Sequence, residues 1–252
     1  MTLRLTIRTA LMAGSFLGST GASWAAVLRP RSPAGLSWMG PGGSSGSVPW
    51  NIVVLLTLLT LLPALLLAMT PFARLLVVFH FLRQALGTQT APSNQILIGL
   101  ALILTLFLMQ PVMAAIQHAA ILPYEEGRVD AVRAVELGSA PLRQFMLKYA
   151  REKDLALFLE LAKQPRPARP EDLSMRVVMP AYILSELKAG FQIGAALYLP
   201  FLVVDMVVAA ITTSVGMLQL PPVVISTPLK ILLFVMVDGW NLLVGSLLKS
   251  FG

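Results

Sequence analysis

The sequence contains no cysteine and only two histidines among its 252 residues. The lack of cysteine excludes disulfides, thiol catalysis and zinc sites built on cysteine. His80 and His118 have no second histidine or acid at metal-binding spacing, so we expect neither a metal nor a cofactor. Nucleophile elbows, zinc-protease motifs and phosphate-binding loops are also missing from the sequence. These absences argue against an enzyme.

Charge is scarce as well, since 12% of the residues are charged and 56% are hydrophobic. A soluble domain carries about 25% charged residues, so much of this surface must face lipid or other apolar helices. The net charge is +7, but no basic patch with interleaved aromatic residues points to nucleic acid. Cationic loops beside anionic lipid account for the charge. The composition predicts a membrane protein.

The first 49 residues predict a targeting segment followed by a linker. Arg4 and Arg8 precede a short apolar run, and Ser23-Trp24-Ala25 suits cleavage after a small residue. We therefore expect a signal peptide over residues 1–25. Residues 26–49 are rich in proline, glycine and serine, which predicts a disordered linker.

Four apolar segments follow and predict an all-α membrane protein. They run over residues 50–69, 95–116, 189–211 and 223–248. Each is long enough to span a membrane as a helix, and we expect two helical hairpins, over residues 50–117 and 181–252. Residues 70–93 are predicted to be a short loop that contains Arg74 and Arg83 but no acid, which is typical of the cytoplasmic side.

The region between the hairpins, residues 118–180, holds ten basic and nine acidic residues. Leu142, Phe145, Met146 and Tyr149 recur at helical spacing, so this polar insertion is predicted to be helical. A signal peptide followed by two spans would return the chain outward. We therefore expect the insertion to be periplasmic.

Charges in or beside the apolar segments are the most informative residues. Asp205 lies in the third segment, Lys230 and Asp238 lie in the fourth, and Glu186 lies near the expected start of the third, where it is predicted to be interfacial. A lone charge at mid-membrane costs about 2.5–3.5 kcal/mol, so each needs compensation.

Pairing of Asp205 with Lys230 is left open by their spacing. Counted from the turn at Leu220-Pro221-Pro222, they lie about 16 and about 8 residues away. A simple hairpin would then separate them by about a dozen ångströms along its axis. Pairing within one chain, pairing between neighbouring chains, and a purely structural role all remain open.

The segment Met217-Leu218-Gln219-Leu220 follows Gly216 and precedes a double proline. Methionine and leucine adapt to irregular contacts, so this loop could seal a pore, although an ordinary turn explains it equally well. Four helices cannot enclose a wide channel in one chain, so a pore would need several copies. Gly190, Gly194, Gly239 and Gly245 favour close helix packing, within one chain or between chains.

Long stretches of the sequence resemble the FliP family, in the same order along the chain. They are residues 70–74, 83–89, 91–95, 141–146, 180–194, 200–206 and 221–240. The resemblance covers roughly residues 50 to 250. It departs at Met217-Leu218-Gln219, where family members often carry a run of methionines and this chain has a polar glutamine.

The resemblance implies a non-enzymatic subunit of the flagellar type III export gate in the bacterial inner (cell) membrane. Several copies would assemble with the FliQ and FliR subunits and other flagellar export components into a pore for unfolded flagellar proteins. It implies that residues 217–220 line the constriction. The charges Asp205, Lys230, Asp238 and Glu186 are expected to be buried and to support assembly or gating.

Two alternatives to a flagellar gate subunit are an injectisome subunit and a small-molecule transporter. An injectisome subunit is similar, but the predicted signal peptide favours the flagellar branch. A small-molecule transporter predicts internal repeats, and none is visible.

Overall fold

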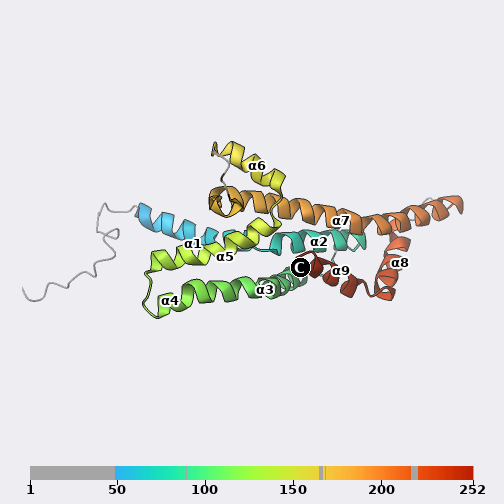
Figure 1. Cartoon of the computed structure of the whole chain (residues 1–252). Helices are drawn as coiled ribbons and strands as arrows, with labels where there is room; N and C mark the ends of the chain where they lie inside the picture. The colour runs from blue at the N-terminus through green and yellow to red at the C-terminus, as the bar shows by residue number, and fades with distance from the viewer. Residues whose placement is uncertain (1–48, 89, 165–166, 168, 217–220, 252) are drawn as a thin grey trace, which may run out of the picture. The chain divides into compact units, whose positions relative to one another are not determined.

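The computed structural model describes residues 49–251, apart from residues 89, 165–166, 168 and 217–220. The described residues form helices and connecting turns without a strand (Figure 1), so the predicted all-α fold is confirmed. The chain divides into two units, residues 1–57 and 58–252. The predicted signal peptide, and the predicted linker up to residue 48, lie outside the described residues.

The α-helices are α1 (Trp50–Ala68), α2 (Phe72–Ala85), α3 (Asn94–Ile116), α4 (Leu122–Glu125), α5 (Ala131–Tyr149), α6 (Glu152–Leu161), α7 (Met175–Ser214), α8 (Pro222–Met236) and α9 (Gly239–Lys249). A π-helical turn (Gln117–Ile121) joins α3 to α4, and a 3₁₀ turn (Pro170–Asp172) precedes α7.

Three described helical stretches are long and apolar enough to cross a membrane: Trp50–Ala68, Asn94–Glu125 and Met175–Ser214. A fourth candidate is the pair α8 and α9, which bends by 66° at its break. These stretches match the four apolar segments predicted from the sequence. The second runs on to Glu125, so the predicted boundary at residue 117 falls inside a helix.

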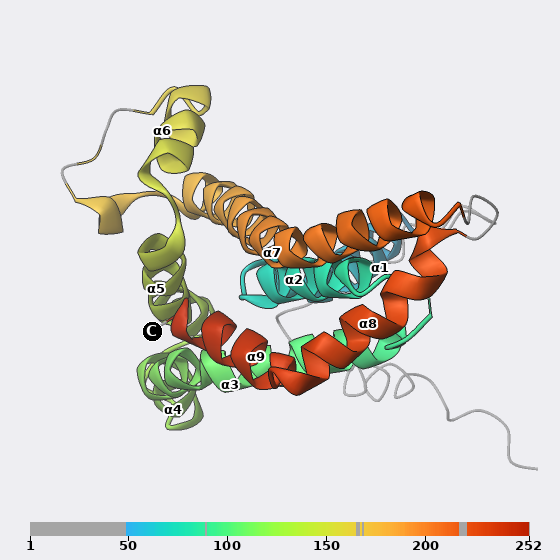
Figure 2. The same ribbon diagram turned by 90° about the vertical axis from the view of Figure 1, so that its right-hand side faces the viewer.

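The helix α2 replaces most of the loop predicted over residues 70–93. Its residues Leu75, Val78, Phe79 and Leu82 are buried at helical spacing. It lies between α7 and α3 (Figures 1 and 2), and its side chains form one core with α3, α8 and α9. The loop prediction was wrong because the apolar periodicity within this short segment was not recognised.

Small residues let α7 approach α2 closely. A Cβ atom added at Gly194 would lie 2.5 Å from Cδ2 of Phe81, and one added at Gly190 would lie 3.1 Å from Val77. Both glycines therefore pack within the chain. A Cβ at Gly87, which ends α2 with a φ of +72°, would lie 2.7 Å from Oγ1 of Thr227 in α8.

The helix α7 is one continuous helix of 40 residues, and it begins well before residue 189, where the third apolar segment was expected to start. At about 1.5 Å per residue it is roughly 60 Å long, twice the ~30 Å hydrocarbon core of a bilayer. Most of its buried residues lie in the N-terminal half. The C-terminal half exposes large apolar side chains, among them Leu199, Leu202, Val203, Met206, Val207 and Ile211. One half is therefore suited to lipid or to other chains, and the other to a core.

A second core joins α5 to the start of α7. Phe145 and Met146 of α5 are buried, and Leu142 and Tyr149 are partly buried against the same cluster. The predicted helix with this apolar stripe is confirmed. Val177, Val178 and Tyr182 supply the α7 side.

Candidate functional site: charged contacts along α7

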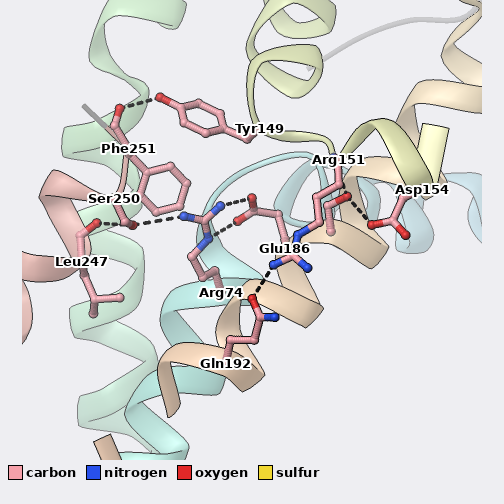
Figure 3. Close-up of polar contacts among 10 residues, drawn as sticks. Arg74, Tyr149, Arg151, Asp154, Glu186, Gln192, Leu247, Ser250 and Phe251 are labelled. Carbon is pink, nitrogen blue, oxygen red and sulfur yellow. Dashed lines mark hydrogen bonds and ion pairs between the residues drawn. The ribbon is translucent and has the colours of Figure 1, made fainter. Parts of the chain in front are cut away.

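Four polar side chains on the N-terminal half of α7 each contact another segment. They are Ser185, Glu186, Lys188 and Gln192, here called the α7 polar band, of which Figure 3 labels Glu186 and Gln192. Ser185 and Glu186 continue the buried stripe that begins with Val178, Ala181 and Tyr182. These two residues therefore follow from helical spacing, because the face that packs the core also carries them, whereas Lys188 and Gln192 are exposed.

Glu186 forms a buried, two-point ion pair with Arg74 of α2. Arg74 Nε donates to one carboxylate oxygen at 2.9 Å and Nη2 donates to the other at 2.5 Å. Glu186 is fully buried and Arg74 is 6% exposed. Paired N–H donors match the shape of a carboxylate and make such contacts directional. The pair fixes the rotation of α2 against α7.

The residues after α9 complete the surroundings of Arg74. Arg74 Nη1 donates to Oγ of Ser250 at 3.1 Å, and the guanidinium lies 3.9 Å from the ring centre of Phe251. The hydroxyl of Tyr149 donates to the carbonyl oxygen of Phe251 at 2.5 Å. Figure 3 shows Glu186, Ser250 and the ring of Phe251 around the guanidinium, and the hydroxyl of Tyr149 directed at the carbonyl of Phe251. Arg74 of α2 thus connects α7 to the segment that follows α9, and Tyr149 connects α5 to that same segment.

Asp154 anchors α6 to α7. It accepts a hydrogen bond from Ser185 Oγ at 2.8 Å and forms an ion pair with Lys188. Arg151 donates its backbone N–H to Ser185 Oγ at 2.9 Å and its Nη2 to Gln192 at 2.5 Å. Burial raises the pKa of Asp154. The hydrogen bonds from Lys188 and Ser185 and the nearby cations lower it by more than burial raises it, so the pKa lies below its usual value.

Asp205 and Lys230 form an ion pair within the chain, between α7 and α8. Asp205 lies nine residues before the end of α7 and Lys230 eight after the start of α8. Measured from the helix ends, the two positions are level. The predicted offset arose because residues 215–220 were counted as helix. The Lys230 side chain is 4% exposed, and the buried Oδ1 of Asp205 has no hydrogen-bond partner among the described residues.

The FliP family profile matches residues 55–247. The chain belongs to the FliP family. It is 50% identical over 210 residues to the flagellar biosynthetic protein FliP of Pectobacterium carotovorum, covering 83% of this chain and 81% of that protein. It is 46% identical over 201 residues to the protein of the same name from Bacillus subtilis, covering 80% and 91% respectively.

Three of the FliP-like stretches meet along the N-terminal half of α7. Residues 70–74 supply Arg74, residues 141–146 supply the buried Phe145 and Met146, and residues 180–194 supply the band itself. Sequence reasoning missed the roles of Arg74, Asp154 and Lys188. Arg74 and Lys188 lie in these stretches, which place charges beside apolar runs without showing which charge meets which, and Asp154 lies outside them.

Glu186 and Asp238 differ in burial within the single chain of this FliP-family protein. Glu186 is buried, as the family resemblance implied, and its interfacial placement was wrong because α7 begins at Met175 and encloses it in the core. Asp238 is exposed in the single chain. It sits at the break between α8 and α9 with a left-handed backbone, φ 51° and ψ 51°, so the predicted continuous fourth helix is bent at this residue.

The predicted pore loop, Met217-Leu218-Gln219-Leu220, lies outside the described residues. The structure describes only its flanks. The helix α7 ends at Ser214, Gly216 has a φ of +79°, and α8 begins at Pro222. A positive φ suits glycine, which has no Cβ to clash. Within the described residues, no group of three or more His, Cys, Asp or Glu side chains could hold a metal ion.

Proposed function

We propose that this FliP-family chain is a pore-building subunit of the flagellar type III export gate and passes unfolded flagellar proteins across the inner membrane. The observation that carries the proposal is family membership over residues 55–247. The relatives named above are flagellar biosynthetic proteins at 46–50% identity. The apolar helices, three of them long enough to cross a membrane, fit this location.

Exposed apolar surface supports assembly into an oligomer. The C-terminal half of α7 and much of α8 expose large apolar side chains, and a hollow of about 450 Å³ between α7, α8 and α9 is lined by Phe201, Phe234 and other apolar residues. Faces this apolar need lipid or protein partners. Several copies of this chain, together with FliQ and FliR, would cover them.

The proposed roles of the site follow from its position. The Asp205–Lys230 ion pair would fix α8 against α7. It would thereby position the connection between the two helices, whose residues 217–220 would line the constriction. Glu186 keeps the core behind it rigid. Asp238, exposed in the single chain, would meet a neighbouring subunit.

A clean deletion in the native bacterium tests the proposed function. The expected result is loss of flagellin from the medium and of filaments in electron micrographs, with both restored by the gene in trans. Normal flagella with lost secretion of virulence effectors would assign the chain to an injectisome instead. Normal secretion of both classes, in a strain with no second copy, would contradict the proposal.

Replacing Asp205 by alanine is expected to abolish swimming and hook-protein secretion while the protein remains in the membrane. The substitution leaves the buried ammonium of Lys230 without its counter-charge, which is costly in a low-dielectric site. The measurement is hook protein in the medium, with an immunoblot of the membrane fraction. Normal secretion by this variant would remove the pair from the mechanism.

The double variant Asp205→Ala with Lys230→Met is the matched control. It removes the uncompensated charge and keeps a long apolar side chain. Recovery of secretion would show that pairing alone matters, whereas continued loss would show that at least one of the two charges has a role beyond pairing.

Glycine at positions 217 to 219 is expected to make the gate leak ions. Removing the side chains widens any constriction that they form. The measurement is ion permeability of cells that express the variant, and the same change at Thr213 and Ser214, on the neighbouring turn of α7, is the control. Permeability equal to wild type would make residues 217–220 an ordinary turn.

A further inference from the structure

Two adjoining hollows lie between α2, α3 and α7, away from the polar band. One, of about 630 Å³, has polar walls that include His80, Arg83, Gln84, Thr88 and Tyr198. The other, of about 420 Å³, is lined mainly by Leu76, Val77, Leu97, Ile98 and Phe191. Both are bordered by His80, Phe81 and Gln84, so the two hollows are direct neighbours.

Arg83 brings an uncompensated positive charge to the polar hollow. It forms no ion pair with any described residue, unlike Arg74 on the same helix. Among the residues that the structure describes, no acidic side chain lines either hollow. The position of Arg83 in the last turn of α2 accounts for part of its stabilisation, but its remaining N–H groups have no protein acceptor among the described residues.

Further polar groups line the hollow around His80. Arg83 Nη2 lies 3.3 Å from His80 Nδ1, and because a guanidinium only donates, Nδ1 is the acceptor in this contact. The amide nitrogen of Gln84 lies 3.4 Å from His80 Nε2. Gln84 and Tyr198 also line the polar hollow, and their amide and hydroxyl groups can donate hydrogen bonds.

A hollow with surplus donors and a cation suits a ligand that only accepts hydrogen bonds and carries negative charge. The adjoining apolar hollow adds room for a hydrocarbon chain. We propose that these two hollows bind an anionic phospholipid, with the phosphodiester at Arg83, Gln84 and Tyr198 and an acyl chain along Leu76, Val77 and Ile98. A free anion would use only the first hollow, and an acidic side chain of another subunit would leave the second unfilled.

Native mass spectrometry of the full chain in detergent tests the site, with phosphatidylglycerol and phosphatidylcholine of identical acyl chains as probes. Phosphatidylglycerol is expected to bind more tightly than phosphatidylcholine. Arg83→Gln should weaken its binding about tenfold, the effect of losing one charge-assisted hydrogen bond. Arg83→Lys should retain most of it. Arg176→Gln, which removes an exposed arginine elsewhere, should change nothing.

A second variant, Ile98→Trp, separates a lipid from a simple anion. Filling the apolar hollow should weaken phosphatidylglycerol and leave the binding of inorganic phosphate unchanged. Equal binding of inorganic phosphate and phosphatidylglycerol would overturn the proposal, because the acyl chain would then contribute nothing. Unchanged phosphatidylglycerol binding in Arg83→Gln, with the same unfolding transition as wild type, would overturn it as well.

Discussion

Replacing Glu186 by alanine is expected to destabilise the protein by about 3–5 kcal/mol, the cost of leaving one partner of a buried ion pair without the other. Arg74 has two of its hydrogen bonds to this carboxylate, and both side chains are nearly inaccessible to solvent. Unfolding of the detergent-solubilised protein by added dodecyl sulfate measures the effect. In cells, the variant should fall in abundance, and secretion should fall with it.

Two comparisons identify the ion pair as the cause. Arg176→Ala removes an exposed arginine of α7 that forms no ion pair among the described residues, so it should unfold close to wild type. Replacing Arg74 and Glu186 together by methionine and leucine should recover much of the lost stability, because no charge is then left buried. If Glu186→Ala alone unfolds like wild type, the carboxylate does not hold α2 to α7.

Replacing Gly194 by alanine is expected to destabilise the protein by about 1–3 kcal/mol, the usual cost of overpacking a core. The new Cβ would lie 2.5 Å from Cδ2, 2.6 Å from Cγ and 2.9 Å from Cβ of Phe81. These atoms include the base of the side chain, so a rotamer change cannot clear all of them. The two helices must separate, and the same unfolding titration would record the loss.

Gly99 provides the matched control for this substitution. It lies inside α3, and a Cβ added there meets nothing within 4 Å. Alanine at this position should be neutral or should stabilise the protein by about 0.5–1 kcal/mol through helix propensity. If both variants behave alike, the close approach of α7 to α2 does not constrain residue 194. Adding Phe81→Ala to Gly194→Ala should restore part of the stability by removing Cγ and Cδ2.

Local pattern was enough to predict most helices but not how they pack. The apolar segments and the α5 stripe of Phe145 and Met146 were predicted because length and periodicity depend only on neighbouring residues. The helix α2 was missed although Leu75, Val78, Phe79 and Leu82 have the required spacing. The prediction looked for apolar segments long enough to span a membrane. A helix of 14 residues is shorter than that, so it was assigned to the loop between two spans.

The charge pairs depended on helix ends, which a sequence specifies poorly. Glu186 was assigned to an interface because α7 was expected to start about a turn after it, whereas the helix begins at Met175. Asp205 and Lys230 were predicted to lie at different heights because the third helix was expected to continue to the double proline, whereas α7 ends at Ser214. The partners of Glu186 and Lys188 are Arg74 and Asp154, 112 and 34 residues away, and no spacing rule connects positions so distant.

The distance along the chain between Arg74 and Glu186 also sets an order of events during synthesis. A ribosome that adds about 5–20 residues per second reaches Glu186 roughly 6–22 s after Arg74. For that interval the guanidinium has no counter-ion from α7, and an unpaired cation resists entry into lipid. The segment around Arg74 therefore waits in water or at the bilayer surface while the more apolar helices insert. This segment can join the core only when α7 has been made. Ser250 lies 176 residues after Arg74, so its hydrogen bond to the guanidinium forms later still.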